Sequence, residues 1–249
     1  MAATNNQGRT LDRALDVLEC VTSTHEPITL TEISRATGLH LATTQRVIGQ
    51  LVKRDYLRNT PRGYTLGPQV LPMSHSFVLQ DRLTLVSPSV LSALTDHTSL
   101  TSSVFVRVAD RRVLVSRVEA PNPLSYQFPV GQVLGLFVGG GKVMLAHADE
   151  DDRERLLDSY EPVTLANGRV QDLSALRADL EQVREAGYFL AESERSRDSL
   201  SSTAPIWSPD DRLLGTINVV ANSGDVGRAE LEEHTSTLLQ ASRRITAQM

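Results

Sequence analysis

The residues whose types could do chemistry gather in one segment, GLHLATTQRVIGQLVKRDYL, residues 38–57. Its polar residues are His, Thr, Gln, Arg and Lys, and no acid precedes Asp55. Thr and Gln can donate to phosphate oxygens or to base edges, and Arg pairs with guanine or with phosphate. Because an acid would repel a polyanion, this pattern predicts that the segment binds DNA. The predicted contacts are His40, Ala42, Thr43, Gln45, Arg46 and Gln50, with Arg58 and Arg62 touching the DNA backbone.

The charge is distributed unevenly along the 249-residue chain, whose formal net charge is −5. Residues 1–70 hold eight Lys and Arg against six Asp and Glu, whereas residues 71–249 hold 17 against 24. Within residues 35–70 there are six basic residues and a single acid, Asp55. This local excess is typical of a small DNA-binding module joined to an acidic domain. A solvated basic face without a partner is the alternative.

Three helices are expected to position the segment. Apolar residues at helical spacing predict the first helix over residues 9–22 and the third over about 41–54. Between them, Thr29 and Glu32 have the spacing of a capping box at the start of the second helix. Gly38 can adopt the left-handed conformation that ends that helix.

The third helix is expected to have a buried and an exposed side. Its inward residues, at helical spacing, are Thr44, Val47, Ile48 and Leu51. The predicted DNA contacts then remain on the outer side. Two short strands around a Pro-Arg-Gly turn at residues 61–63 predict a hairpin. Helix, helix, tight turn, helix and hairpin is the order of a winged helix-turn-helix.

Prolines mark the connection to the second part of the chain. Pro72 and Pro88 interrupt the apolar periodicity, so we expect a linker helix followed by a second helix that starts near Ser87, the cap before Pro88. The predicted domains are 1–70 for the DNA-binding domain, 71–86 for the linker helix and 87–249 for the C-terminal domain.

The C-terminal part is expected to be an α+β domain with an antiparallel sheet. Apolar and polar residues alternate over residues 101–119 and 201–221, each around a turn, which predicts two hairpins. Helical patterns cover 141–160, 172–187 and 228–248. Hairpins flanked by helices, without strict alternation of strand and helix, are typical of this class.

Several motifs are better explained by structure than by chemistry. The GGGK at 139–142 lacks the spacing of a phosphate-binding P-loop and is interpreted as a strand-to-helix turn. The acidic run 149–152 suits a helix start. Cys20 is expected in the core, and the six histidines lack metal-ligand spacing, so no metal and no cofactor is predicted. The N-terminus lacks a signal-peptide pattern, and a cytoplasmic protein is expected.

Catalysis is the weaker hypothesis. Ser199, Ser201 and Ser202 could supply a nucleophile, but no G-x-S-x-G elbow surrounds them. We therefore predict no catalytic residue. A hydrolase of small esters or amides and a sensory module whose helix-turn-helix binds protein remain as alternatives.

The whole chain resembles the isocitrate lyase regulator (IclR) family of bacterial transcription factors. The residues that carry the resemblance are RALDVLE, LTEISRATGL, TTQRVIGQLVKRDYL, YTLG, the GK at 141–142, the GY at 187–188, Glu194 and APIW. It implies a winged helix-turn-helix joined by a helix to a GAF-like effector-binding domain. It also implies a homodimer or a dimer of dimers on near-palindromic double-stranded DNA, and small organic or aromatic acids as effectors.

The effector site is expected on the strands and turns of the C-terminal domain. Ser201 takes the place where the family has Cys or Ser, and Thr203 shares its side of the strand. The predicted effector-binding residues are Phe137, Gly139, Gly140, Glu192, Glu194, Ser201, Thr203 and Asn218. Because the segment 130–142 is largely apolar, an aromatic or amide-bearing ligand is favoured over a small, highly charged one. We expect a ligand-responsive repressor.

Overall fold

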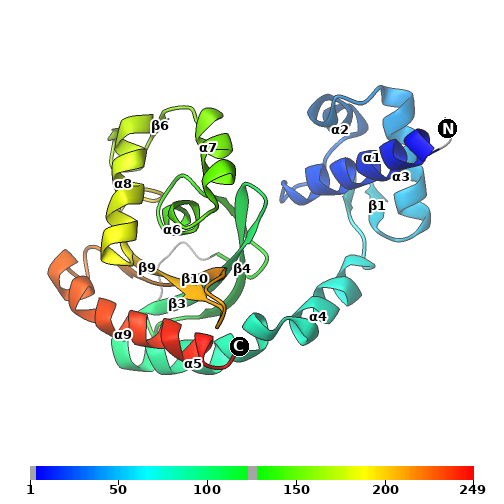
Figure 1. Ribbon diagram of the computed structural model, residues 1–249. Helices are drawn as coiled ribbons and strands as arrows, with labels where there is room; N and C mark the ends of the chain where they lie inside the picture. The colour runs from blue at the N-terminus through cyan, green and yellow to red at the C-terminus, as the bar shows by residue number, and fades with distance from the viewer. Residues whose placement is uncertain (1–3, 123–127) are drawn as a thin grey trace. The chain divides into compact units, whose positions relative to one another are not determined.

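The computed structural model describes residues 4–122 and 128–249 (Figure 1). Packing divides the chain into two compact units, Met1–Gln80 and Asp81–Met249. Within the described ranges, none of the helices combines the length and the apolar character that a membrane span requires. No three His, Cys, Asp or Glu side chains of these ranges are grouped so that they could hold a metal ion.

The first unit has the predicted order of a winged helix-turn-helix. Its elements are α1 (Thr4–Thr22), α2 (Leu30–Thr37), α3 (Leu41–Lys53), β1 (Leu57–Thr60), β2 (Gly63–Leu66) and α4 (Val70–Gln80). The three helices and the hairpin enclose a small core whose fully buried members include Val17, Ile33 and Ile48. Cys20 packs at the edge of this core, as expected.

Local contacts fix the turns of this unit. Thr29 and Glu32 form the predicted capping box, and Gly38 ends α2 at φ 68°. The hairpin is tied to the connection before α2, because Ile28 and Tyr64 exchange backbone hydrogen bonds of 2.8 and 3.0 Å. A Cβ on Gly63 would lie 2.5 Å from the Ile28 carbonyl oxygen, so the close approach requires glycine.

The second unit is built on a six-stranded sheet with the order β5-β4-β3-β10-β9-β8, antiparallel throughout. The predicted α+β class is confirmed. Its strands are β3 (Thr101–Val108), β4 (Arg111–Val118), β5 (Val133–Gly135), β8 (Phe189–Glu192), β9 (Ser199–Trp207) and β10 (Leu213–Asn222). A separate small hairpin pairs β6 (Val163–Thr164) with β7 (Val170–Gln171).

Helices cover both faces of the sheet (Figure 1). On one face, α5 (Arg82–Thr98) and α9 (Arg228–Thr246) pack over a core that includes Leu91, Ile217 and Leu238. On the other face lie α6 (Gly141–Ala146), α7 (Glu150–Asp158) and α8 (Leu173–Ala186), with a second core around Phe105, Val143 and Leu176. The acidic run after Ala148 begins α7, as predicted.

One predicted boundary is wrong. The second helix of the connection begins at Arg82 and not near Ser87, because the Asp81 carboxylate caps it by accepting the Thr84 N–H at 2.8 Å. Pro88 is therefore inside α5, where buried neighbours such as Leu91 anchor the helix despite the missing N–H. The helical pattern over 141–160 is divided into α6 and α7 by residues 147–149, and α7 starts at the acidic run.

A β-bulge in β4 decides which of its side chains share a face. Val104 pairs with Ser116 and Phe105 pairs with Leu114, so Val115 is the extra residue. Leu114 then belongs to the core on the α6 side, and Val115 belongs to the core on the α5 side. Residues five apart across the bulge, such as Arg112 and Arg117, are brought to the same face.

Candidate functional site

The outer side of α3 is one candidate site. Thr44, Val47, Ile48 and Leu51 are buried, as predicted. Of the predicted DNA contacts, Thr43 is half-buried, and the exposed ones are His40, Ala42, Gln45, Arg46, Gln50, Arg58 and Arg62. His40 is the N-cap of α3, but its side chain makes no capping hydrogen bond. Its ring is thus available to a ligand.

The charges around α3 are solvated. The six basic side chains of residues 35–70 are all exposed. Arg62 approaches Glu26 at 3.9 Å, but both side chains are at least 80% exposed, so the pair is weak. Exposed cations without a strong internal partner can neutralise phosphates of a DNA duplex.

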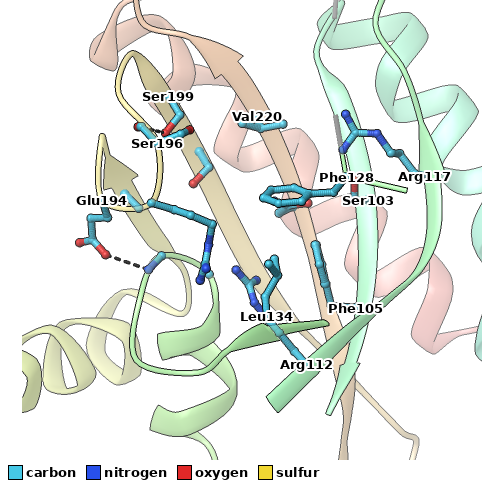
Figure 2. Close-up of a pocket in the computed structure, with 16 residues that line it drawn as sticks. Ser103, Phe105, Arg112, Arg117, Phe128, Leu134, Glu194, Ser196, Ser199 and Val220 are labelled. Carbon is cyan, nitrogen blue, oxygen red and sulfur yellow. Dashed lines mark hydrogen bonds between the residues drawn. The ribbon is translucent and has the colours of Figure 1, made fainter. Parts of the chain in front are cut away.

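A cavity in the second unit is the other candidate site. It lies between the β3, β4, β9 and β10 strands and two connecting segments, the turn at 139–140 and the loop after β8 (Figure 2). Its volume is about 70 Å³. The lining residues are Ser103, Phe105, Arg112, Arg117, Phe128, Leu134, Gly139, Gly140, Ala191, Glu194, Arg195, Ser196, Ser199, Ser201, Asn218 and Val220.

Arg112 is the most unusual group of the cavity. Its side chain is buried on β4, with the guanidinium carbon 4.5 Å from the centre of the Phe105 ring. Nε and Nη1 have no hydrogen-bond partner among the described residues. Burial, and to a lesser extent the charge of Arg195, lowers the pKa of Arg112 to about 9. A cation held in this way is strongly attracted to an anion that enters the cavity.

Three polar side chains at paired positions of neighbouring strands form a row beside Arg112. Arg117 pairs with Ser103 across β4 and β3, and Ser103 pairs with Asn218 across β3 and β10. Arg117 Nη2, Ser103 Oγ and Asn218 Oδ1 lack hydrogen-bond partners among the described residues. Arg117 Nε lies 3.5 Å from Glu119 Oε1, which opposes the lowering of the Arg117 pKa by burial. The row can receive hydroxyl or carboxylate oxygens. In Figure 2, Phe128 lies between the two arginines.

An ion-pair cluster holds the turn that closes the cavity. Glu194 Oε2 accepts the Gly139 N–H at 2.8 Å, and its Oε1 lies 2.7 Å from Lys142 Nζ. Lys142 Nζ also lies 2.6 Å from Asp179 Oδ2 on α8. Arg195 donates to the Val138 carbonyl at 3.0 Å. The side chains of Glu194 and Arg195 therefore hold the loop after β8 against the 138–142 segment.

Five of the eight residues predicted to bind an effector line the cavity: Gly139, Gly140, Glu194, Ser201 and Asn218. The other three lie elsewhere. Phe137 packs edge-on against Tyr160, with ring centres 5.0 Å apart. Glu192 is exposed and lies 3.7 Å from Arg228. Thr203 shares the face of Ser201, but the turn covers it, since a Cβ on Gly140 would collide with its side chain.

The sequence reasoning missed the arginines of the cavity. Arg112 and Arg117 lie in a hairpin for which only an alternation of apolar and polar residues was predicted, and the bulge brings both arginines to one face. Arg112 alternates with Leu114, a signal that could have placed it on the buried side. The predicted wall was apolar, whereas the cavity contains three arginines and one glutamate.

The serines do not form a catalytic arrangement. Ser202 Oγ points to the α9 side, 3.2 Å from Thr235 Oγ1, and Ser199 Oγ donates to the Ser196 carbonyl at 2.7 Å. Ser201 lines the cavity, but the described lining contains no histidine to activate it.

A winged helix-turn-helix with an exposed, acid-free α3, followed by a domain with a charged cavity, defines a DNA-binding regulator. The family models agree: the IclR helix-turn-helix domain matches residues 10–61, and the bacterial transcriptional regulator IclR C-terminal domain matches residues 78–247. The chain belongs to the IclR family. Members of this family are transcription regulators that bind DNA, and they are not enzymes.

Similar proteins support this assignment along the whole chain. The Pca regulon regulatory protein of Pseudomonas putida is 25% identical over 94% of this chain and 81% of its own length. The transcriptional regulator BhcR of Paracoccus denitrificans is 27% identical over 96% and 86%. The fold matches an IclR homologue of Microbacterium hydrocarbonoxydans, solved in complex with 4-hydroxybenzoate, at a TM-score of 0.75 and 23% identity, over 96% of this chain and 98% of that one.

Proposed function

We propose that this regulator responds to a small organic acid that binds in the cavity of the second unit. The observation that carries the proposal is the Arg112 guanidinium, which is buried and lacks a hydrogen-bond partner at Nε and Nη1. Leaving a buried cation unpaired is costly, so the arrangement is favourable only when an anion joins it. A carboxylate satisfies two N–H groups of one guanidinium at once.

The charges around the cavity favour an acid over an amide. Glu119 lies 3.5 Å from Arg117 and Glu194 lies 2.7 Å from Lys142, so each of these carboxylates already has a cationic partner. Among the described residues, Nε and Nη1 of Arg112 have no such partner, which favours an anionic ligand. The hydroxyl and amide groups of Ser201, Ser103 and Asn218 would orient its remaining polar atoms.

The size of the cavity favours a small ligand. An apolar cavity that admits benzene in another protein measures about 150 Å³, roughly twice the volume here. An aromatic acid such as 4-hydroxybenzoate, the ligand of the Microbacterium homologue, would require Phe128 to move. A short aliphatic acid would fit with less rearrangement.

We propose that the functional species is a homodimer on a near-palindromic operator, and that a dimer of dimers is its larger form. Each residue of α4 from Leu71 to Gln80 is exposed, and Leu71, Met73 and Leu79 are each more than half exposed. Such apolar exposure on a helix favours contact with a second copy. Two α3 helices would then read half-sites about 34 Å apart, contacting DNA through the residues predicted from the sequence.

The effector would act on the separation of the two α3 helices. A change in that separation weakens binding to a fixed pair of half-sites without altering any base contact. We propose repression that the acid relieves, and a cytoplasmic site of action, because the target is the bacterial chromosome.

The DNA part of the proposal is tested by fluorescence anisotropy with a labelled duplex carrying the promoter upstream of the chain's own gene. We expect the protein to bind this duplex with an affinity that falls steeply between about 50 and 200 mM salt, as phosphate contacts require. An unrelated duplex of equal length is the control. No preference for the promoter duplex at any salt concentration would contradict operator recognition.

The ligand part is tested by a thermal-shift screen of short aliphatic and aromatic acids against their amides. We expect at least one acid to raise the melting temperature and to release the promoter duplex, while the matching amide does neither. Stabilisation by amides alone would contradict the role given to Arg112.

A further inference from the structure

Lys142, at the start of α6, is a cation buried without exposure to solvent. Its Nζ contacts carboxylates of two other segments, Asp179 at 2.6 Å and Glu194 at 2.7 Å, and lies 4.7 Å from the centre of the Phe189 ring. Buried ion pairs add little net stability, because desolvation offsets their attraction. The cluster therefore calls for an explanation other than stability.

Glu194 and Arg112 flank the same turn of the cavity wall. Glu194 Oε2 lies 2.8 Å from Gly139 N, and Arg112 Nη1 lies 2.9 Å from the position that a Cβ on Gly140 would take. Both side chains line the cavity. A carboxylate and a guanidinium attract strongly at low dielectric, yet no hydrogen bond or ion pair joins these two.

The two oxygens of Glu194 are already engaged. Oε2 accepts the Gly139 N–H, and Oε1 accepts from Lys142 Nζ. Among the described ion pairs, the Lys142 ammonium is the only charged donor that holds Glu194, so it fixes this carboxylate at the turn.

We propose that Lys142 is a positioning residue that keeps the Glu194 carboxylate away from Arg112, and so keeps the Arg112 guanidinium available to an anionic effector. The inference rests on the proposed function of the cavity as an anion-binding site. Without Lys142, Asp179 can hydrate, because its side chain is 19% exposed, whereas Glu194 is only 8% exposed. Glu194 would then pair with Arg112 and occupy the place of the effector's carboxylate.

The test uses three variants of the full chain: Lys142→Met, Glu194→Gln and the double variant. The measurements are calorimetric affinity for 4-hydroxybenzoate and crystal structures without ligand. In Lys142→Met we expect Glu194 to lie within hydrogen-bond distance of Arg112 and the affinity to fall about tenfold or more. In the double variant the competing carboxylate is gone, and the affinity should return to within about threefold of Glu194→Gln.

Rescue separates this role from a merely structural one. If Lys142 only packed against its neighbours or supported α6, adding Glu194→Gln would not restore the affinity that Lys142→Met loses. A double variant that stays as weak as Lys142→Met overturns the proposal, as does a Lys142→Met structure in which Glu194 remains on Gly139. Asp179→Asn is the matched control: it keeps the Lys142–Glu194 pair, so the affinity should stay within about twofold.

The outcome does not depend on one variant or on the probe. If Lys142→Met fails to fold by circular dichroism, the double variant and Glu194→Gln still decide, and a difference above about tenfold between them overturns the proposal. If the wild type does not bind 4-hydroxybenzoate, the result counts against the proposed function of the cavity as a site for this acid. The position of Glu194 in the crystal structures still decides the role of Lys142.

Discussion

Arg46 on α3 and Arg112 in the cavity are the same residue type in opposite environments. Arg46 is exposed, so its charge is hydrated at no cost and can attract any polyanion, but salt screens it. Arg112 is 4% exposed, so its charge has lost most of its hydration, and a ligand of matching shape gains more by pairing with it. One unit thus recognises charge density, and the other recognises an individual anion.

The largest expected effect comes from removing the buried charge. Arg112→Met should weaken binding of the stabilising acid by about 100-fold or more, since truncating a buried charge pair costs about 3–5 kcal/mol. It should also raise the melting temperature without ligand, because an unpaired buried cation is removed. Isothermal titration calorimetry measures the affinity, and differential scanning calorimetry measures the melting temperature.

Arg111→Met is the matched control for that change, because the neighbouring side chain is 60% exposed. It should leave both quantities nearly unchanged. An equal loss of affinity in the two variants would mean that burial of Arg112 does not matter for binding. It would contradict the proposed difference between buried and exposed arginines.

On α3 the effect of removing one cation should be smaller and dependent on salt. Arg46→Ala should weaken operator binding about tenfold and lower the slope of log affinity against log salt by about 1. Anisotropy titrations at several salt concentrations measure both. Arg243→Ala, an exposed arginine on α9, is the control. An unchanged slope in Arg46→Ala would argue against a phosphate contact.

The pH dependence of acid binding should report the ionisation of the buried Arg112. Because the pKa of Arg112 is about 9 in the folded protein, acid binding should be constant from pH 7 to 8 and fall by up to about tenfold per unit above pH 9. The unfolded chain keeps this proton to higher pH, so the contribution of Arg112 to stability should rise with pH above 9. Calorimetry at pH 7, 8, 9 and 10 measures the affinity, with Arg112→Met as the flat reference.

The smallest expected effect concerns the frame that presents α3. Thr29→Ala removes the two hydrogen bonds of the Thr29 hydroxyl, one from the Glu32 N–H and one to the Glu32 carboxylate, and leaves the bond from the residue-29 N–H to Glu32. It should lower the free energy of unfolding by about 1 kcal/mol. Urea denaturation of the full chain measures it, and the exposed Thr31→Ala on α2 is the control. A loss as large in the control would show that the cap does not contribute.

Sequence reasoning succeeded where local patterns decide the structure. The helical period of α3 predicted its four buried residues, and the spacing of Thr29 and Glu32 predicted the capping box. It also placed five residues at the cavity. It did not place Arg112 and Arg117 in the cavity, because they share a face only through a bulge in β4, and the pairing of β3 with β4 sets the position of that bulge.

Two further errors have different origins. Thr203 was assigned to the correct side of β9, but the turn at Gly140, which is distant in sequence, covers it. Ser87 and Pro88 have the local signature of a helix start, yet the helix begins earlier, at the local cap that Asp81 forms, and tertiary packing carries it through the proline. Contacts between distant segments therefore explain Thr203 and the continuation through Pro88, whereas the Asp81 cap was a local signal that the sequence analysis did not use.

The extra residue in β4 has a consequence for how related chains are compared. Deleting Val115 would remove the bulge and leave Arg112 and Arg117 four residues apart, so regular alternation would keep both on the cavity face. Two relatives that differ by a single gap at this point would then enclose the same charges. For this cavity, the strand pairing that each arginine keeps matters more than the number of residues between the two arginines.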